Sequence, residues 1–157
     1  MFKLRTANES DLPGINQVIE AAILGWDLPE RVKRLSLPSY RYTAMDLKHL
    51  EIIIAEQDGK IVALASWEPA DKNDTPSQQS TLLLHGLYVH PSLQHQGLGT
   101  QLFNAIENIA KEKSFDGLLV KAQKDANEFF KKQAMKPLIV TNPDKDYENR
   151  YWKSLHT

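Results

Sequence analysis

Hydrophobic and polar positions along this chain follow two periods, and the change of period marks where strands give way to helices. Residues 82–89 form an apolar run rich in strand-forming side chains, and Pro91 follows just after its end. Apolar side chains then recur at helical spacing from Leu98 to Ala110. The pattern predicts a strand, a tight turn and an amphipathic helix, in that order.

The predicted strand is apolar on both faces. Alternation puts Leu83, His85, Leu87 and Val89 on one face, and it puts Leu82, Leu84, Gly86 and Tyr88 on the other. We therefore expect an interior strand that is covered on both sides.

The rest of the chain predicts a single α/β (α+β) domain over residues 1–157. Helix-capping residues precede Pro13, and these are Asn8, Ser10 and Asp11. A helix is predicted from there to Gly25, and further helices over residues 30–35, 44–50 and 125–133. Strands are predicted over residues 2–5, 51–56, 60–67, 115–122, 136–140 and 150–155, with a loop over 69–79 and a turn over 142–148.

Three local signals refine this order. Pro29 and Pro38 are expected to break helical structure between residues 26 and 42. Asp58-Gly59 predicts a tight hairpin turn. A hairpin followed by a strand–helix–strand unit predicts a mixed, mostly antiparallel sheet with helices on both faces.

Composition excludes several classes of function. The 157 residues carry a formal net charge of −1 with scattered lysines and arginines, so no nucleic-acid or membrane partner is expected. Cysteine is absent, which excludes disulfides and thiol chemistry. The histidines are dispersed and G-x-S-x-G does not occur, so no metal site and no serine hydrolase is expected. Without a signal peptide or a long apolar run, a cytoplasmic protein is the expectation.

Two glycines stand where the predicted helix begins, in Gln94-His95-Gln96-Gly97-Leu98-Gly99. Glycine lets a backbone approach a ligand closely, and the amides and dipole of a first helical turn attract anionic oxygens. The physical reading is a phosphate cradle, and a plain tight turn is the alternative. A dinucleotide-binding fingerprint fits less well because Leu102 stands where its third glycine belongs.

The spacing Gln-x-x-Gly-x-Gly resembles the acyl-CoA pyrophosphate loop of the GNAT superfamily of N-acetyltransferases. The preceding residues 87–91 (LYVHP) and the segments 4–12 (LRTANESDL) and 126–135 (ANEFFKKQAM) are also similar to that family, so the likeness covers nearly the whole chain. It implies that strands 82–89 and 115–122 splay apart and that acetyl-CoA, as cosubstrate, binds between them. The cofactor-binding residues so implied are Leu87, Tyr88, Val89, Gln94, His95, Gln96, Gly97, Leu98, Gly99, Thr100, Gln123, Asn127 and Phe130.

The chain departs from the family at three positions, two of which are among these residues. Phe130 stands where a proton-donating tyrosine is common, Gln123 where an asparagine is common, and Ala134 where a glycine is common. The expected reaction is direct attack of a primary amine on the thioester in a ternary complex, which requires a base. His85 is the candidate base, and a packed core histidine is the alternative.

The acceptor is expected to be a small-molecule amine or a peptide or protein amine, and both a monomer and a homodimer stay open. Its pocket is predicted from residues 26–42, 69–79 and 142–151. Aromatic residues occur there, and Asp144, Asp146 and Glu148 favour a cationic amine or form a solvated loop. Two other hypotheses remain: an acyl-CoA-binding or regulatory module without transfer activity, which Phe130 favours, and a nucleotide-binding module.

Overall fold

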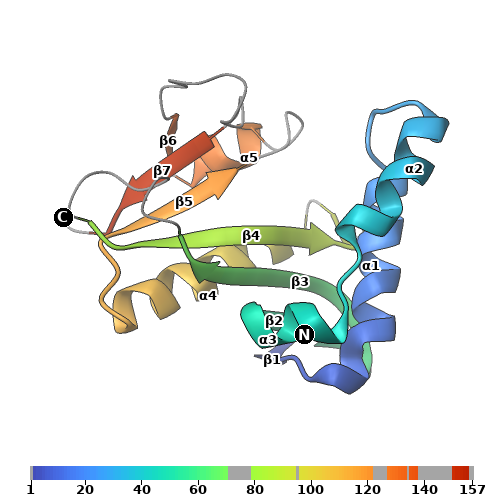
Figure 1. The fold of residues 1–157 in the computed structure, drawn as a ribbon, viewed down its shortest axis with the longest axis horizontal. Helices are drawn as coiled ribbons and strands as arrows, with labels where there is room; N and C mark the ends of the chain where they lie inside the picture. Colours follow the sequence, from blue (N-terminus) through green and yellow to red (C-terminus); the bar gives the residue numbers. More distant parts are fainter. Residues whose placement is uncertain are drawn as a thin grey trace. The chain divides into compact units, whose positions relative to one another are not determined.

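The computed structural model describes residues 2–70, 79–94, 96–121, 127–133, 135–137 and 150–155 (Figure 1). The chain groups into two compact units. Unit 1 comprises residues 1–66 and 86–104, and unit 2 comprises residues 67–85 and 105–157. Strands β3 (Lys60–Pro69) and β4 (Thr81–Val89) and helix α4 (Leu98–Glu112) run on from one unit into the other.

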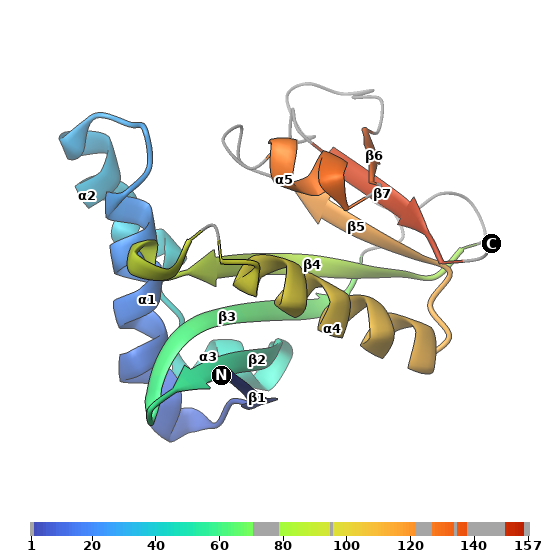
Figure 2. The same cartoon turned by 180° about the vertical axis from the view of Figure 1, so that it is seen from behind.

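Unit 1 begins with a strand, a capped helical turn and a long helix. Its other elements are β1 (Lys3–Thr6), η1 (Glu9–Asp11), α1 (Leu12–Leu24), α2 (Glu30–Tyr40), α3 (Ala44–His49), β2 (Glu51–Gln57) and η3 (Pro91–Leu93). Strand β1 pairs antiparallel with β2, which is joined to β3 by the predicted hairpin turn (Figure 2). Asp58 and Gly59 both have positive φ, 53° and 77°, as a two-residue hairpin of the right twist requires, so this prediction is confirmed.

The core of unit 1 lies between α1 and the strands. Helix α1 buries one face at helical spacing, and β2 and β3 contribute side chains from the sheet. The principal members of this core are Ile15, Val18, Ile19, Ile23, Ile52, Ile54 and Leu64. The predicted helical face of α1 is therefore the face that packs.

Helix α2 corrects the prediction that Pro38 breaks it. Pro38 lies inside α2, close to the C-terminal end of the helix, where a missing N–H interrupts little of the hydrogen-bond ladder. Lys33 and Leu37 of this helix are buried, and Lys33 Nζ donates a hydrogen bond of 2.8 Å to the Leu24 carbonyl at the end of α1. Packing against α1 therefore outweighs the local cost of the proline.

Asp11 connects β1 to the start of α1. Its carboxylate accepts a hydrogen bond of 2.8 Å from each of two Arg5 nitrogens, and a third of 2.8 Å from the Asn8 amide. Arg5 also contacts Glu56 of β2. The Arg5 guanidinium holds the pKa of the Asp11 carboxyl below its usual range. Asp11 thus completes a capping box with Asn8 and ties the helix entry to the sheet.

We expect Asp11→Asn to lower the free energy of unfolding by about 1–2 kcal/mol, because it removes a capping carboxylate. The melting temperature should fall by roughly 3–6 °C. A carboxyl whose pKa is lowered by folding stabilises above its unfolded value, about 3.9, and loses that effect as the pH falls. Chemical denaturation at several pH values between 7 and 3 measures the free energy of unfolding of the variant and of the unchanged protein. The difference between the two should shrink as the pH falls. The exposed Asp27→Asn should show no difference at any pH; a constant Asp11→Asn deficit would contradict the argument.

Unit 2 is built on the beginning of β4 and the strand that pairs with it. Its other elements are β5 (Gly117–Lys121), α5 (Asn127–Lys132), β6 (Lys136–Pro137) and β7 (Arg150–Ser154). Strand β7 lies between β5 and β6 and is antiparallel to both (Figure 1). The strand order is β1-β2-β3-β4-β5-β7-β6, so the predicted mixed and mostly antiparallel sheet is confirmed.

Strands β4 and β5 are parallel over part of their length. The register pairs Thr81–Leu84 with Gly117–Val120, in the first half of β4. These residues are buried in both strands, as expected for a strand covered on both sides. The predicted splaying of the two strands stays a prediction, because the residues that follow β5 lie outside the described part of the chain.

A bulge interrupts the alternation predicted for β4. The Ala70 amide donates to the Thr81 carbonyl over 2.8 Å, and the His90 amide donates to the Val62 carbonyl over 2.9 Å. Between these two bonds β4 contains one more residue than β3, which defines a β-bulge. Strict alternation along β4 was therefore wrong, because one extra residue shifts the side chains that follow it to the other face.

Element boundaries differ from the predictions by a few residues. Helix α2 continues five residues past the predicted end at Leu35. Strand β5 starts at Gly117 and not at Phe115, because the Asp116 amide turns toward the Ser80 carbonyl, 2.8 Å away. Several parts of predicted elements lie outside the described residues: 71–78 of the loop over 69–79, the end of the strand at 122, 138–140 of the strand over 136–140, and the turn over 142–148.

Candidate active site

The end of β4 in unit 1 leads through a short, well-anchored connection into α4. His90 follows the strand and caps η3, and its Nδ1 lies 2.8 Å from Ser92 Oγ and accepts the Ser92 amide over 3.2 Å. Because η3 is held in this way, the segment after it starts from a fixed point. Leu98, 1 % exposed, anchors the other end of the segment in the core. Gln94, Gln96 and Gly97 therefore lie between η3 and the first turn of α4.

Gly97 has a backbone conformation that favours glycine. Its φ is +81°, which side chains other than glycine rarely adopt, and a Cβ built there would meet nothing within 4 Å. Its carbonyl accepts the Gln101 amide over 3.0 Å, the start of the α4 hydrogen-bond ladder. The amides that precede Gln101 belong to the first helical turn, where a helix attracts anions. Gly97 therefore presents an open side at the N-terminus of α4.

The predicted loop residues are placed around this glycine. Gln94, Gln96 and Gly97 are exposed, and Gly99 and Thr100 are half-buried in the first turn of α4. His95 lies outside the described residues, as do Gln123 and the acidic segment with Asp144, Asp146, Tyr147 and Glu148. Asn127 begins α5, with only its backbone described.

A buried tyrosine–serine pair lies beside the second half of β4. Tyr42 Oη and Ser66 Oγ are 2.6 Å apart, and both residues are buried. A Cβ at Gly86 would stand 2.7 Å from Tyr42 Oη and 2.9 Å from a Tyr88 ring carbon, so only glycine fits there. Burial raises the pKa of the Tyr88 phenol, and the nearby Tyr42 and Tyr40 raise it further. Tyr88 is therefore a neutral, packed phenol. The sequence indicated Tyr42 only as one of the aromatic residues of the predicted acceptor pocket, and it gave no signal for Ser66.

His85, in unit 2, is exposed. Its side chain is 46 % exposed, and its Nδ1 lies 4.0 Å from Oε2 of Glu68 on β3. The alternative that His85 is a packed core histidine was therefore wrong. The sequence did not indicate Glu68, because a cross-strand neighbour depends on the register of β3 and β4, which the bulge shifts.

Phe130 lies in the core of unit 2. It is 5 % exposed, stacks on Tyr151 with ring centroids 6.2 Å apart, and meets the Phe129 ring edge-on at 5.1 Å. Tyr151 itself is 3 % exposed. The position therefore supplies packing and no hydroxyl group.

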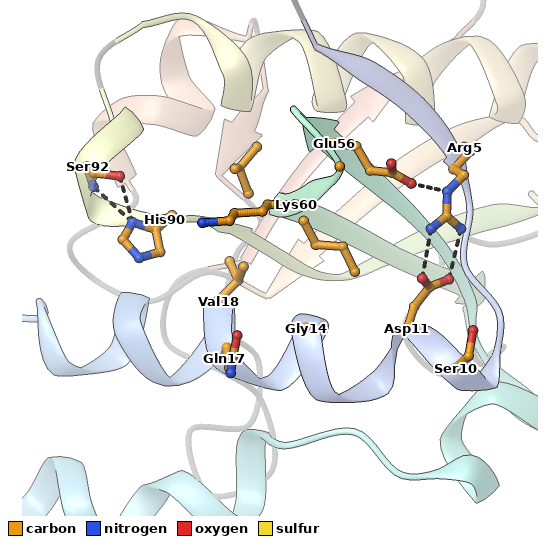
Figure 3. Close-up of a pocket in the computed structure, with 13 residues that line it drawn as sticks. Arg5, Ser10, Asp11, Gly14, Gln17, Val18, Glu56, Lys60, His90 and Ser92 are labelled. Carbon is orange, nitrogen blue, oxygen red and sulfur yellow. Dashed lines mark hydrogen bonds and ion pairs between the residues drawn. The ribbon is translucent and has the colours of Figure 1, made fainter.

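A polar groove of about 660 Å³ opens elsewhere in unit 1 (Figure 3). Helix α1, the β2–β3 hairpin and η3 line it, and none of the predicted site residues does. Arg5, Asp11 and Glu56 at one end bind one another, as the dashed lines in Figure 3 show. The groove therefore does not mark the predicted site. Within the described part of the chain, no three metal-ligating side chains come together either.

Comparison with known proteins identifies the family. Residues 20–135 match the model of the acetyltransferase (GNAT) family, which is most of the chain. The protein therefore belongs to the GNAT acetyltransferase family. No curated protein sequence matches the chain. No helix among the described residues has the length and apolar character needed to cross a membrane.

Solved structures share the fold over nearly the whole chain. The PaiA N-acetyltransferase of Thermoplasma acidophilum, in complex with coenzyme A, has a TM-score of 0.78 at 14 % identity, with 98 % of this chain and 99 % of that chain covered. A GCN5-related N-acetyltransferase of Rhodopseudomonas palustris has a TM-score of 0.76 at 25 % identity, with 98 % and 95 % covered. The AtaTR complex with acetyl-CoA has a TM-score of 0.64 at 18 % identity, with 98 % and 93 % covered.

Proposed function

We propose that this protein transfers the acetyl group of acetyl-CoA to a primary amine by direct attack in a ternary complex. The observation that carries the proposal is Gly97, whose positive φ and open side stand at the N-terminus of α4 within the matched family region. Family membership supports acetyl transfer, and two of the similar structures contain coenzyme A or acetyl-CoA.

The cosubstrate would be held by backbone and loop groups of this chain. The amides of the segment from Gln94 to Thr100 would bind the pyrophosphate, since a helix start favours anionic oxygens. The backbone of Leu87, Tyr88 and Val89 at the end of β4 would pair with the pantetheine arm. Gln123, Asn127 and Phe130 would flank the thiol end.

The chemistry requires removal of a proton from the attacking amine, because a protonated amine has no lone pair to donate. Imidazole can accept that proton near neutral pH, so His85, with its exposed side chain, is the proposed base. Formation of the N–C bond and cleavage of the C–S bond then release a thiolate, and the new amide nitrogen loses its second proton, which the thiolate takes up through solvent. A thiol of pKa about 8.5 is a tolerable leaving group, so a tyrosine at position 130 is not required.

Acetyl-CoA should stabilise the fold. At about 100 times Kd a ligand that binds only the folded state adds about 2.7 kcal/mol, which should raise the melting temperature by roughly 5–10 °C. The measurement is thermal unfolding with acetyl-CoA, CoA, NAD and ATP at equal concentration. No shift with acetyl-CoA, or a larger shift with NAD or ATP, would contradict the assignment and favour a nucleotide-binding module.

An acyl-CoA-binding module without transfer activity is the second candidate, favoured by the buried Phe130. The two functions differ in turnover, so a panel of small amines and peptides with acetyl-CoA, followed by CoA release, separates them. Stabilisation by acetyl-CoA without release on any amine would favour the binding module. Release above the rate without amine establishes transfer and identifies the acceptor class.

A further inference from the structure

We infer that Glu68 is a positioning residue for His85, an assignment that rests on the proposed function of His85 as the base. Glu68 lies on β3 and His85 on β4, which are neighbours in the sheet. The Glu68 carboxylate faces the Nδ1 side of the ring at 4.0 Å, within unit 2. The two residues thus pair a carboxylate with an imidazole across adjacent strands.

Both residues stand where the buried run of their strand ends. Residues 63–67 of β3 are buried and Glu68 after them is half-buried, and residues 81–84 of β4 are buried and His85 after them is exposed. Two polar groups therefore meet at one place on an otherwise apolar pair of strands. An exposed pair of this kind adds little to stability, since solvent screens it, so stability does not account for it.

The bulge in β4 gives a second reason to assign function here. One extra residue of β4 is accommodated between the Ala70–Thr81 and Val62–His90 hydrogen bonds, and His85 lies between these limits. Bulges are frequent next to active sites, where they redirect a side chain out of the regular alternation. The His85 side chain is exposed in a strand whose preceding residues are buried, as such a redirection produces.

The geometry determines which ring nitrogen can act. A carboxylate on the Nδ1 side favours a proton on that nitrogen, directly or through one water molecule, because 4.0 Å exceeds a direct hydrogen bond. The lone pair then lies on Nε2, the nitrogen turned away from Glu68. Nε2 takes one proton from the protonated amine before the N–C bond forms, and the Glu68 charge stabilises the resulting imidazolium. Solvent later removes that proton.

The test is a double-mutant cycle of Glu68→Gln with His85→Ala, measured as amine acetylation. Glu68→Gln keeps the side-chain size and removes the charge, so kcat should fall about tenfold while KM for the amine stays within about twofold. In the His85→Ala background the same change should cost nothing further. Glu68→Asp should recover part of the rate, and the exposed Glu51→Gln should match the unchanged protein.

A second readout needs no substrate. In protein labelled with 15N at histidine, the ring nitrogen shifts of His85 report its tautomer, and Glu68→Gln should change the balance away from a proton on Nδ1. Wild-type kcat together with an unchanged tautomer in Glu68→Gln would overturn the inference. An equal loss of kcat from Glu68→Gln with His85 present and with His85→Ala would overturn it as well. If the unchanged protein transfers no acetyl group, the proposed function fails, and the nitrogen shifts still decide whether Glu68 positions the ring.

Discussion

Gly97→Asp should reduce the affinity for acetyl-CoA by about 100-fold while the protein stays folded. The new side chain would project from the open side of Gly97, where no protein atom lies within 4 Å of the added Cβ. A carboxylate placed there repels a pyrophosphate and blocks the approach of the helix amides. The loss of one or two charge-assisted hydrogen bonds, about 1.5–3 kcal/mol each, gives this magnitude. Isothermal titration with acetyl-CoA measures it.

The chain offers a matched control in Gly59. Its φ is +77°, close to that of Gly97, and a Cβ there also meets nothing within 4 Å, but it lies in the β2–β3 hairpin. Gly59→Asp therefore carries the same backbone strain, and aspartate is among the residues that tolerate positive φ best. Both variants should lose similar stability, and only Gly97→Asp should lose affinity. Equal affinity in the two variants would show that the loop before α4 is a plain turn.

The parts of the fold that follow from local chemistry were predictable from sequence. Asp58-Gly59 specifies its hairpin because both residues tolerate positive φ, and the structure has both there. Asn8 and Asp11 specify the start of the first helix through hydrogen bonds within four residues of chain. The apolar period from Leu98 onward specifies α4, whose spacing needs no partner to be recognised.

Structural features that depend on contacts between residues far apart in the sequence were not predictable from the sequence. Pro38 is tolerated in α2 because Lys33 and Leu37 pack on α1, and the sequence carries no sign of that contact. The extra residue in β4 is defined by hydrogen bonds to β3, so neither it nor the exposure of His85 within that stretch could be predicted from the sequence. In the sequence, Glu68 is only a polar residue at the end of a predicted strand. It gains a candidate role only from its place beside His85.

In the candidate site, too, features set by a single residue were predictable and features set by distant contacts were not. Glycine spacing indicated a special backbone conformation at Gly97, and a positive φ was predictable there because it is a property of one residue. The buried Tyr42–Ser66 pair and its close approach to Gly86 join residues from distant parts of unit 1, so no local motif reports them. Phe130 stands where a proton-donating tyrosine is common in the family. In the structure its ring stacks on Tyr151, so the residue has a packing role.

His85→Ala should lower kcat for amine acetylation by about 100-fold, the usual contribution of a general base. The fall of kcat toward acid pH should disappear in the variant, because protonation of the base causes that limb. The melting temperature and the affinity for acetyl-CoA should stay unchanged, since the His85 side chain is 46 % exposed and little packing is lost. Steady-state rates between pH 5 and pH 9, with thermal unfolding on the same samples, give all three quantities.

The control for this experiment is His49→Ala, which removes an exposed histidine at the end of α3. It should keep both the rate and the acid limb. Added imidazole should restore part of the rate to His85→Ala alone, because the truncation leaves room beside Glu68 for a free base. A His85→Ala protein with normal kcat and an intact acid limb would show that another group takes the proton. A loss of several degrees in melting temperature with little change in kcat would assign His85 a packing role, in conflict with its exposure.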